Sequence, residues 1–458
     1  MFFEQIYDKT LAQASYLVGC QVSKEAIVID PKRDVDTYLE IAKANNLTIT
    51  HVAETHIHAD FLSGSRELVA LTGAKLFLSD EGGEDWQYEF PHIGLKHADV
   101  IKIGNLTLET LHTPGHTPES ISFLLRDHPA TDEPVMLFTG DFVFVGDVGR
   151  PDLLEEAAGV VGSKDIGAKQ LFESLKLFKT LPDHIQVWPG HGAGSACGKS
   201  LGAVASSTVG YEKIRNWALQ YDDFDAFKSE LLKDQPEAPY YFAMMKKHNK
   251  LDRKLLVEVP QHPIIKVNDL ITDAIVVDTR NKFEFSAGHL PNSINIQNNN
   301  SLANWAGWML PYDKPLVFVA SAQTREEVTR KLMRIGMDNI AGFIEDIGDD
   351  LDQTVLVDAE QVESALAAKD AVLLDVRNVL EFRKGHIAGA YHQFVGKMAK
   401  DLPNFSKDQS IIIQCQAGDR ATIAASYLAS HGFTDVKNYI GSMQDWLAKG
   451  KPVQKTEL

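Results

Sequence analysis

The chain alternates apolar runs typical of buried strands with segments in which apolar residues recur at helical spacing. Residues 25–30 predict a buried strand that ends in a turn at Pro31, and an amphipathic helix is predicted directly after it. The apolar face of that helix would consist of Val35, Tyr38, Leu39 and Ala42. Further strands are predicted at 47–53, 107–111, 121–125, 135–139 and 185–188. This alternation predicts an α/β domain over residues 1 to 235.

The C-terminal part of the chain contains an internal repeat. Residues 278–281 (Asp-Thr-Arg-Asn) recur as 375–378 (Asp-Val-Arg-Asn), and the Gly288–His289 pair recurs at the same offset as Gly385–His386. A repeat of this length indicates a duplicated domain and not a solenoid unit. Each copy begins with a buried β-rich run, at 274–277 and 371–374, which predicts a small parallel α/β domain.

Prolines punctuate a polar stretch between these two parts, at positions 236, 239 and 260. We therefore expect four segments, which are a first domain at 1–235, a linker at 236–260, and repeat domains at 261–350 and 355–458. A chain of 458 residues with 44% hydrophobic content can give each domain its own core. The expected class is a multi-domain α/β protein.

Charge and cysteine content limit the possible partners and the compartment. A formal net charge of −18 argues against nucleic-acid or anionic-membrane binding, which needs a basic surface. The sequence shows neither a signal peptide pattern nor an apolar run long enough to span a bilayer. Three widely spaced cysteines, Cys20, Cys197 and Cys415, form a poor disulfide framework and favour a reducing cytoplasm.

The first domain contains a cluster of residue types that bind metals. The candidates are His56, His58, Asp60, His116, Asp141 and His191. The last three each follow a glycine, where the backbone can turn sharply to aim a side chain. Histidine and carboxylate ligands suit iron or zinc, and a set of two histidines and one carboxylate leaves positions open for substrate and oxygen.

The second repeat contains a cysteine at a predicted strand-to-helix turn. The apolar run 411–413 leads to Cys415, and a helix is predicted from Ala421 to about Ser430. In such a turn, consecutive backbone N–H groups and the helix N-terminus can stabilise a thiolate. A reactive sulfur and a metal centre on one chain together suggest sulfur chemistry coupled to metal chemistry.

Residues 1–235 resemble the metallo-β-lactamase fold, whose signature is His-x-His-x-Asp-His followed by later His, Asp and His residues. This resemblance implies an αββα sandwich. The final His of the signature is replaced by Phe61, which favours one metal over two. Among one-metal members, the sequence is similar to the persulfide dioxygenases, which implies one Fe(II) per chain held by His56, His116 and Asp141.

The same resemblance implies that His58, Asp60 and His191 surround these ligands, orienting them, holding water or facing the substrate. The segment 149–152 (Gly-Arg-Pro-Asp) also resembles the dioxygenase pattern. Its Arg150 would either recognise an anionic substrate tail or pair with Asp152, and we favour the pairing.

Two cysteines in the first domain receive different interpretations. Cys197 lies on a glycine-rich loop near the metal cluster, where it would carry a persulfide with a pKa lowered by Lys199, or simply be a small buried residue. Cys20 follows a predicted strand and is expected to belong to the core.

Residues 355–458 resemble a rhodanese domain, in which a cysteine begins a six-residue loop. That loop would comprise Cys415, Gln416, Ala417, Gly418, Asp419 and Arg420. Gln416 and Asp419 are not the basic loop residues of an enzyme that takes sulfur from thiosulfate, so we expect the loop to accept sulfur from a persulfide or to release thiosulfate. The first repeat also resembles a rhodanese, but Ala320 stands opposite Cys415, so that copy is expected to be catalytically silent, as a spacer or docking surface.

These resemblances imply a cytoplasmic, self-associating enzyme of sulfide detoxification. A low-molecular-weight persulfide and O₂ would give sulfite and thiol at the iron, and Cys415 would then transfer sulfur to sulfite to give thiosulfate. Two other hypotheses are a zinc thioester hydrolase of the glyoxalase II type and a non-catalytic, sulfur-responsive scaffold.

Overall fold

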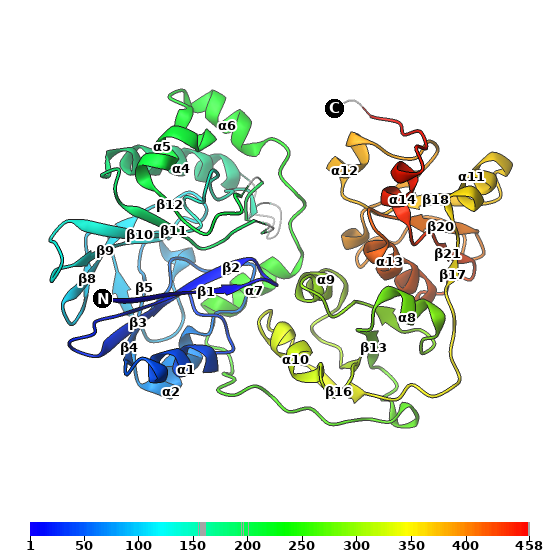
Figure 1. The fold of residues 1–458 in the computed structure, drawn as a ribbon, viewed down its shortest axis with the longest axis horizontal. Coiled ribbons are helices and arrows are strands. Elements are labelled where there is room, and N and C mark those ends of the chain that lie inside the picture. Colours follow the sequence, from blue (N-terminus) through cyan, green and yellow to red (C-terminus); the bar gives the residue numbers. More distant parts are fainter. Residues whose placement is uncertain (154, 156–161, 194, 196, 200, 457–458) are drawn as a thin grey trace. The chain divides into compact units, whose positions relative to one another are not determined.

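The computed structural model divides the chain into two compact units (Figure 1). The first comprises residues 1–259 with 333–336, and the second comprises 260–332 with 337–458. The structure describes residues 1–153, 155, 162–193, 195, 197–199 and 201–456, so positions 194 and 196 of the glycine-rich loop lie outside the described residues.

The first unit contains two six-stranded mixed sheets. The first sheet, in the order β1-β2-β3-β4-β5-β6, comprises β1 (Phe2–Asp8), β2 (Gln13–Gly19), β3 (Glu25–Ile29), β4 (Thr48–Ala53), β5 (Lys75–Ser79) and β6 (Ile93–Leu95). The second sheet, in the order β12-β11-β10-β9-β8-β7, comprises β7 (Val100–Ile103), β8 (Leu106–His112), β9 (Ile121–Asp127), β10 (Pro134–Gly140), β11 (Gln186–Pro189) and β12 (Ser207–Thr208).

Helices cover the outer faces of both sheets. Among the described residues, the helices of this unit are α1 (Asp36–Ala44), α2 (Ser65–Thr72), η1 (Glu84–Trp86), α4 (Ser163–Thr180), α5 (Val209–Arg215), η2 (Trp217–Gln220), α6 (Phe224–Leu232) and α7 (Tyr241–Lys250). One core cluster joins α1 and α2 to the first sheet, and another joins α4, α5 and α6 to the second. A third lies between the sheets, where the rings of Tyr16 and Phe138 are 4.9 Å apart. The αββα sandwich is therefore confirmed.

The predicted strands and the first helix are all present, with ends that differ by one or two residues. Helix α1 buries Tyr38 and Ala42, two of the four apolar residues that its spacing singles out. Cys20 is buried in the core between the sheets, as expected. Among the described residues, no helix is both long and apolar enough to cross a membrane.

The second unit contains two sheets with only parallel pairings. The first, β14-β13-β15-β16, comprises β13 (Ile275–Asp278), β14 (Ile294–Asn295), β15 (Leu316–Val319) and β16 (Ile340–Ile344). The second, β17-β21-β20-β18-β19, comprises β17 (Val355–Leu356), β18 (Val372–Asp375), β19 (Tyr391–His392), β20 (Ile411–Gln414) and β21 (Val436–Asn438). The helices are η3 (Val267–Asp269), α8 (Lys282–Ala287), α9 (Leu302–Met309), α10 (Arg325–Met333), α11 (Ala359–Ala368), α12 (Val379–Lys384), η4 (Val395–Lys397), α13 (Asp419–Ser430) and α14 (Ser442–Ala448).

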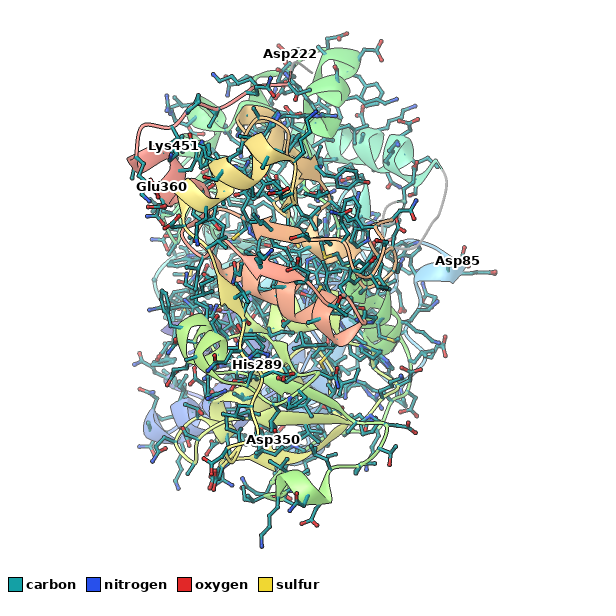
Figure 2. All side chains as sticks on the ribbon, turned by 90° about the vertical axis from the view of Figure 1, so that its right-hand side faces the viewer. Asp85, Asp222, His289, Asp350, Glu360 and Lys451 are labelled. Carbon is teal, nitrogen blue, oxygen red and sulfur yellow. The ribbon has the colours of Figure 1, made fainter. Side chains whose placement is uncertain are left out.

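The repeated sequence motifs form the same local structure twice. Asn281 and Asn378 each begin a helix with a capping box, in which the side chain accepts from the first helical turn. In both copies the motif's arginine pairs with its aspartate, and the histidine ring stacks 3.9 Å from a phenylalanine. His289, labelled in Figure 2, is the histidine of the first copy. These residues therefore hold each domain together.

Several acidic side chains lie on the exposed surface of both units. Asp85 and Asp222 of the first unit, and Asp350 and Glu360 of the second, are exposed (Figure 2). Glu360 lies 3.9 Å from Lys451, an ion pair of the kind that contributes little to stability because water screens it. The acidic surface agrees with the net charge of −18.

The stretch 236–260, expected to be a linker, contains helix α7, which anchors the histidine-rich loop. Asn249 is buried, and its amide donates to the carbonyls of His58 and Phe61, each at 2.8 Å. Its carbonyl accepts from the backbone N–H of Ser63 at 2.8 Å. Prolines at 236 and 239 precede the helix, where they are compatible with its start.

Replacing Asn249 with alanine should destabilise the first unit by about 2–4 kcal/mol, because three buried backbone groups lose their partner. Urea unfolding monitored by tryptophan fluorescence would measure this. Lys247→Ala, at an exposed position of the same helix, is the control and should change stability by less than about 0.5 kcal/mol. Equal stabilities of the two variants would contradict the anchoring role.

Candidate functional site

The metal-binding residue types all lie just beyond the C-terminal ends of strands. His56 follows β4, His116 follows β8, Asp141 follows β10 and His191 follows β11. Gly140, before Asp141, has φ +50°, and a β-carbon there would lie 2.4 Å from the hydroxyl of Thr55. A glycine is therefore required where the two sheets bring these loops together.

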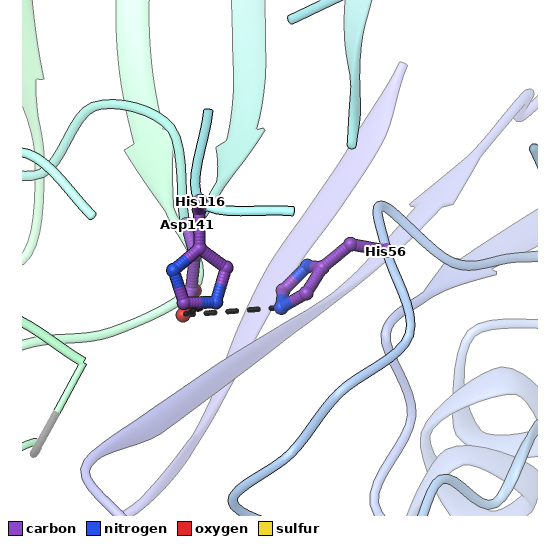
Figure 3. A group of neighbouring side chains, drawn as sticks. All are labelled: His56, His116 and Asp141. Carbon is purple, nitrogen blue, oxygen red and sulfur yellow. Dashed lines mark ion pairs between the residues drawn. The ribbon is translucent and has the colours of Figure 1, made fainter. Parts of the chain in front are cut away.

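Three of these side chains form a compact buried group, drawn in Figure 3. The Nε2 atoms of His56 and His116 lie 3.9 Å and 3.5 Å from Oδ2 of Asp141. One ligand atom from each residue lies within 4.8 Å of the others, which is a spacing that a single cation can bridge. The sequence analysis selected the same three residues.

The hydrogen bonds around this group leave its ligand atoms available for a metal. Nδ1 of His116 lies 2.9 Å from the carbonyl of Arg150, so the ring donates there and its Nε2 keeps a lone pair. Nδ1 of His56 lies 3.0 Å from the hydroxyl of Thr55. Nε2 of His56 and both carboxylate oxygens of Asp141 have no hydrogen-bond partner among the described residues.

Burial lowers the pKa of both His56 and His116, and neighbouring histidines lower the pKa of His56 further. Both rings are therefore neutral near pH 7, which is the form that binds metals. A buried carboxylate left without a partner is costly, so the donor set fits a divalent cation.

His58 lies beside the group but points to a different partner. Its Nε2 is 3.1 Å from Oδ1 of Asp30, which also accepts from the backbone N–H of Thr55 at 2.7 Å. Burial alone would lower the pKa of His58, but Asp30 and Glu54 raise it to about 9. The charged pair orients the loop that carries His56.

Asp60, His191 and Cys197 form a second buried group with metal-ligand atoms. Nε2 of His191 lies 3.3 Å from Oδ2 of Asp60 and 3.4 Å from Oδ1 of Asp141. Both oxygens of Asp60 and Nε2 of His191 also have no hydrogen-bond partner among the described residues. Cys197 lies near the metal-binding residues, as its loop predicts, but no sequence pattern marks it as a member of a ligand set.

The expectation that Lys199 lowers the pKa of Cys197 is wrong. Burial raises the pKa of the Cys197 thiol, and the carboxylates of Asp141 and Asp60 raise it further. Lys199 instead contacts Glu230, with Nζ 3.1 Å from the carboxylate. Closeness in the sequence therefore does not make the lysine a partner of the thiol, because Lys199 pairs with Glu230 and the groups that act on the thiol are carboxylates.

Phe61 and Arg150 take structural positions. Phe61 is fully buried, and its ring centroid lies 4.4 Å from that of His58. An aromatic side chain without a ligand atom therefore occupies the position of the final histidine of the metallo-β-lactamase signature. Arg150 is buried and forms two hydrogen bonds to the carboxylate of Asp152, and it also donates to the carbonyl of Pro236 at 2.7 Å. The ion pair of Arg150 with Asp152 is the alternative that we favoured from the sequence.

A cavity of about 250 Å³ opens beside the turn that carries His116. Its lining includes Trp86, Gly115, Pro118, Pro151 and Lys246. Nζ of Lys246 lies 3.7 Å from the centroid of the Trp86 ring, which gives the cavity an apolar wall and a cation. The lining also includes the carboxylate of Asp85, so the cavity carries one group of each charge.

Cys415 directly follows β20 and is buried, with one backbone N–H and one hydroxyl next to its sulfur. The N–H of Gly418 donates to Sγ at 3.1 Å, and the hydroxyl of Ser442 lies 3.7 Å from the sulfur. Helix α13 begins at Asp419, so its N-terminus lies at the loop. Arg420, the last loop residue, forms two hydrogen bonds to the carboxylate of Glu381, at 2.6 and 2.7 Å.

The corresponding strand of the first repeat, β15, ends directly before Ala320. This position carries a methyl group where the second repeat carries a thiol. The first repeat therefore has the fold of the second but lacks its nucleophile.

Comparison with known proteins agrees with this geometry. The model of the metallo-beta-lactamase superfamily matches residues 9–191, and that of the rhodanese-like domain matches residues 266–346 and 358–449. Persulfide dioxygenase ETHE1 of Bos taurus is 31% identical over 42% of this chain and 68% of its own length. A hydroxyacylglutathione hydrolase of Polaromonas is 36% identical over 39% of this chain and 61% of its own length.

A crystal structure described as a metallo-beta-lactamase from Staphylococcus aureus subsp. aureus COL is 46% identical. It matches with a TM-score of 0.71 over 75% of this chain and 99% of its own. The chain therefore belongs to the metallo-beta-lactamase superfamily, is a homologue of its persulfide dioxygenases, and carries two rhodanese-like domains in addition.

Proposed function

We propose that this chain is an iron-dependent persulfide dioxygenase coupled to a rhodanese sulfurtransferase. The observation that supports the proposal most strongly is the buried group of His56, His116 and Asp141, together with Phe61, whose side chain has no atom that can bind a metal. One relative named as a persulfide dioxygenase shares the domain, and the cysteine loop supplies a second sulfur site on the same chain.

The first reaction would convert a persulfide, O₂ and water into a thiol, sulfite and two protons. A ferrous ion held by His56, His116 and Asp141 would supply oxygen activation and open positions for both substrates. The chain's own part is to fix the two imidazoles through the carbonyl of Arg150 and the hydroxyl of Thr55, and to keep bulk water out of the site by burial.

The second reaction would take place at Cys415. The thiolate attacks the outer sulfur of a persulfide, whose S–S bond breaks, and the departing thiolate takes a proton. Sulfite then attacks the outer sulfur of the Cys415 persulfide, which forms thiosulfate and returns the thiolate. The N–H of Gly418 stabilises the anionic sulfur in each state.

A zinc thioester hydrolase is the second candidate function. Asp60, His191 and Cys197 support it, because they offer ligand atoms for a second metal next to Asp141. Phe61 counts against it, because the side chain offers no ligand atom. A scaffold without catalysis does not explain why so many buried ligand atoms are left without partners. A cytoplasmic location and self-association remain part of the proposal.

Iron content and oxygen uptake test the first reaction. Protein purified without oxygen should contain one iron per chain and consume O₂ with glutathione persulfide or coenzyme A persulfide. His116→Ala should lower both iron content and uptake, the latter by at least about 100-fold. His128→Ala, at an exposed position, is the control and should behave like the wild type. Two zinc ions per chain and thioester cleavage without oxygen uptake would contradict the proposal.

Product analysis tests the coupling. With a persulfide and O₂, the wild type should release thiosulfate, whereas Cys415→Ser should accumulate sulfite at an unchanged rate of oxygen uptake. Cys20→Ala removes a buried thiol from the core of the first unit and should leave the products unchanged. The same product ratio in the wild type and Cys415→Ser would refute sulfur transfer through this loop.

Two glycines allow a matched test of the loop backbone. Gly418 has φ +94°, and a β-carbon there would lie 2.3 Å from the carbonyl of Ile440, whereas Gly432 has φ +85° and open space. Both alanine variants should lose about 1–2 kcal/mol of stability to the left-handed backbone, and Gly418→Ala should lose more than Gly432→Ala because its β-carbon meets the carbonyl of Ile440. Only Gly418→Ala should also lower thiosulfate formation, by at least about tenfold, because the loop must move. Equal rates for the two variants would show that the loop geometry is unimportant.

A further inference from the structure

The cysteine-free repeat contacts the sulfur loop of the second repeat through one lysine. Lys282 is the first residue of helix α8, and its Nζ donates to the carbonyl of Ala417. The same Nζ lies 3.0 Å from Oδ1 of Asp419. Both contacts lie within the second compact unit.

A second residue of the cysteine-free repeat supports this arrangement. Gln297 donates from Nε2 to Oδ1 of Asp419 at 3.1 Å, and its Oε1 accepts from the backbone N–H of Lys282 at 3.0 Å. The lysine side chain is only 17% exposed. Charge-assisted hydrogen bonds at such a position are stronger than those at the open surface, because little water competes with them.

The contact at Ala417 reaches the sulfur through a single peptide group. The carbonyl of Ala417 and the N–H of Gly418 belong to the same planar peptide and point in opposite directions. The carbonyl accepts from Lys282, and the N–H donates to Sγ of Cys415. A cation on the carbonyl side therefore fixes the plane and strengthens the N–H as a donor.

The other cations near the loop are already engaged within the second repeat. Arg420 pairs with Glu381, and Arg377 pairs with Asp375. The position of the second repeat that corresponds to Lys282 carries Val379. The second repeat thus has no lysine of its own at this position of the motif.

We infer that Lys282 of the cysteine-free repeat is a positioning residue for sulfur transfer at Cys415, because it orients the Ala417–Gly418 peptide toward the sulfur. The two repeats then form one composite active site, in which the silent copy supplies a residue and not only support. The inference rests on the proposed sulfurtransferase function of Cys415.

The test compares full-length Lys282→Met, Lys282→Arg and Lys449→Met. Lys449 pairs with Glu360 away from the loop and serves as the control. Lys282→Met should lower kcat for thiosulfate formation about tenfold with an unchanged KM for sulfite, because one charge-assisted hydrogen bond is lost. Lys282→Arg should recover most of the rate, and Lys449→Met should match the wild type.

A second measurement does not depend on turnover. Iodoacetamide should label Cys415 several-fold more slowly in Lys282→Met than in the wild type, as followed by mass spectrometry of the Cys415 peptide. Wild-type rates of both turnover and labelling in Lys282→Met would overturn the inference. If Lys282→Met does not fold, Lys282→Arg provides the test instead. A folded Lys282→Arg variant with tenfold slower turnover and labelling would overturn the inference.

The experiments distinguish a failure of the proposed sulfurtransferase function from a failure of the inference about Lys282. If the wild type forms no thiosulfate, the sulfurtransferase proposal fails, and the labelling rates still report whether Lys282 orients the loop. Slower labelling of Lys282→Met would then support the positioning role alone.

Discussion

One constraint dominates the first unit: burying the carboxylate of Asp141 without a hydrogen-bond partner costs free energy. Both of its oxygens are buried and lack a hydrogen-bond donor among the described residues, and an ionised carboxylate in that position needs a counter-charge. The imidazoles of His56 and His116 beside it do not supply that charge, because burial lowers the pKa of both rings and leaves them neutral. A metal ion is the counter-charge that this arrangement fits best.

The sulfur site also has to stabilise a buried anionic group, and it does so with different chemical groups. Cys415 is buried as well, but its environment consists of a backbone N–H, a hydroxyl and a helix N-terminus, which stabilise an anion without a metal. The fold occurs twice in the chain, and of the two copies only the second has a thiol at this position. The contact of Lys282 with the loop explains why the copy without a thiol would still be needed.

Much of this could be predicted from the sequence, since strands with strong apolar patterns have ends that are easy to locate. The three candidate ligands lie beyond such ends, each in a short turn, so the periodicity and the family pattern together found them. The side-chain partners could not be predicted in the same way. Lys199 turns away from Cys197, Asn249 reaches back to a loop far along the chain, and Lys282 contacts a loop of the other repeat. Such contacts depend on packing between distant segments, which leaves no periodic signal.

The central claim is that one ferrous ion is bound by His56, His116 and Asp141. X-ray diffraction on crystals grown without oxygen, with data collected on both sides of the iron absorption edge, tests it most directly. The account predicts one iron peak per chain, bonded to Nε2 of both histidines and to the carboxylate. Two metal peaks, with the second bonded to Asp60, His191 and Cys197, would contradict it.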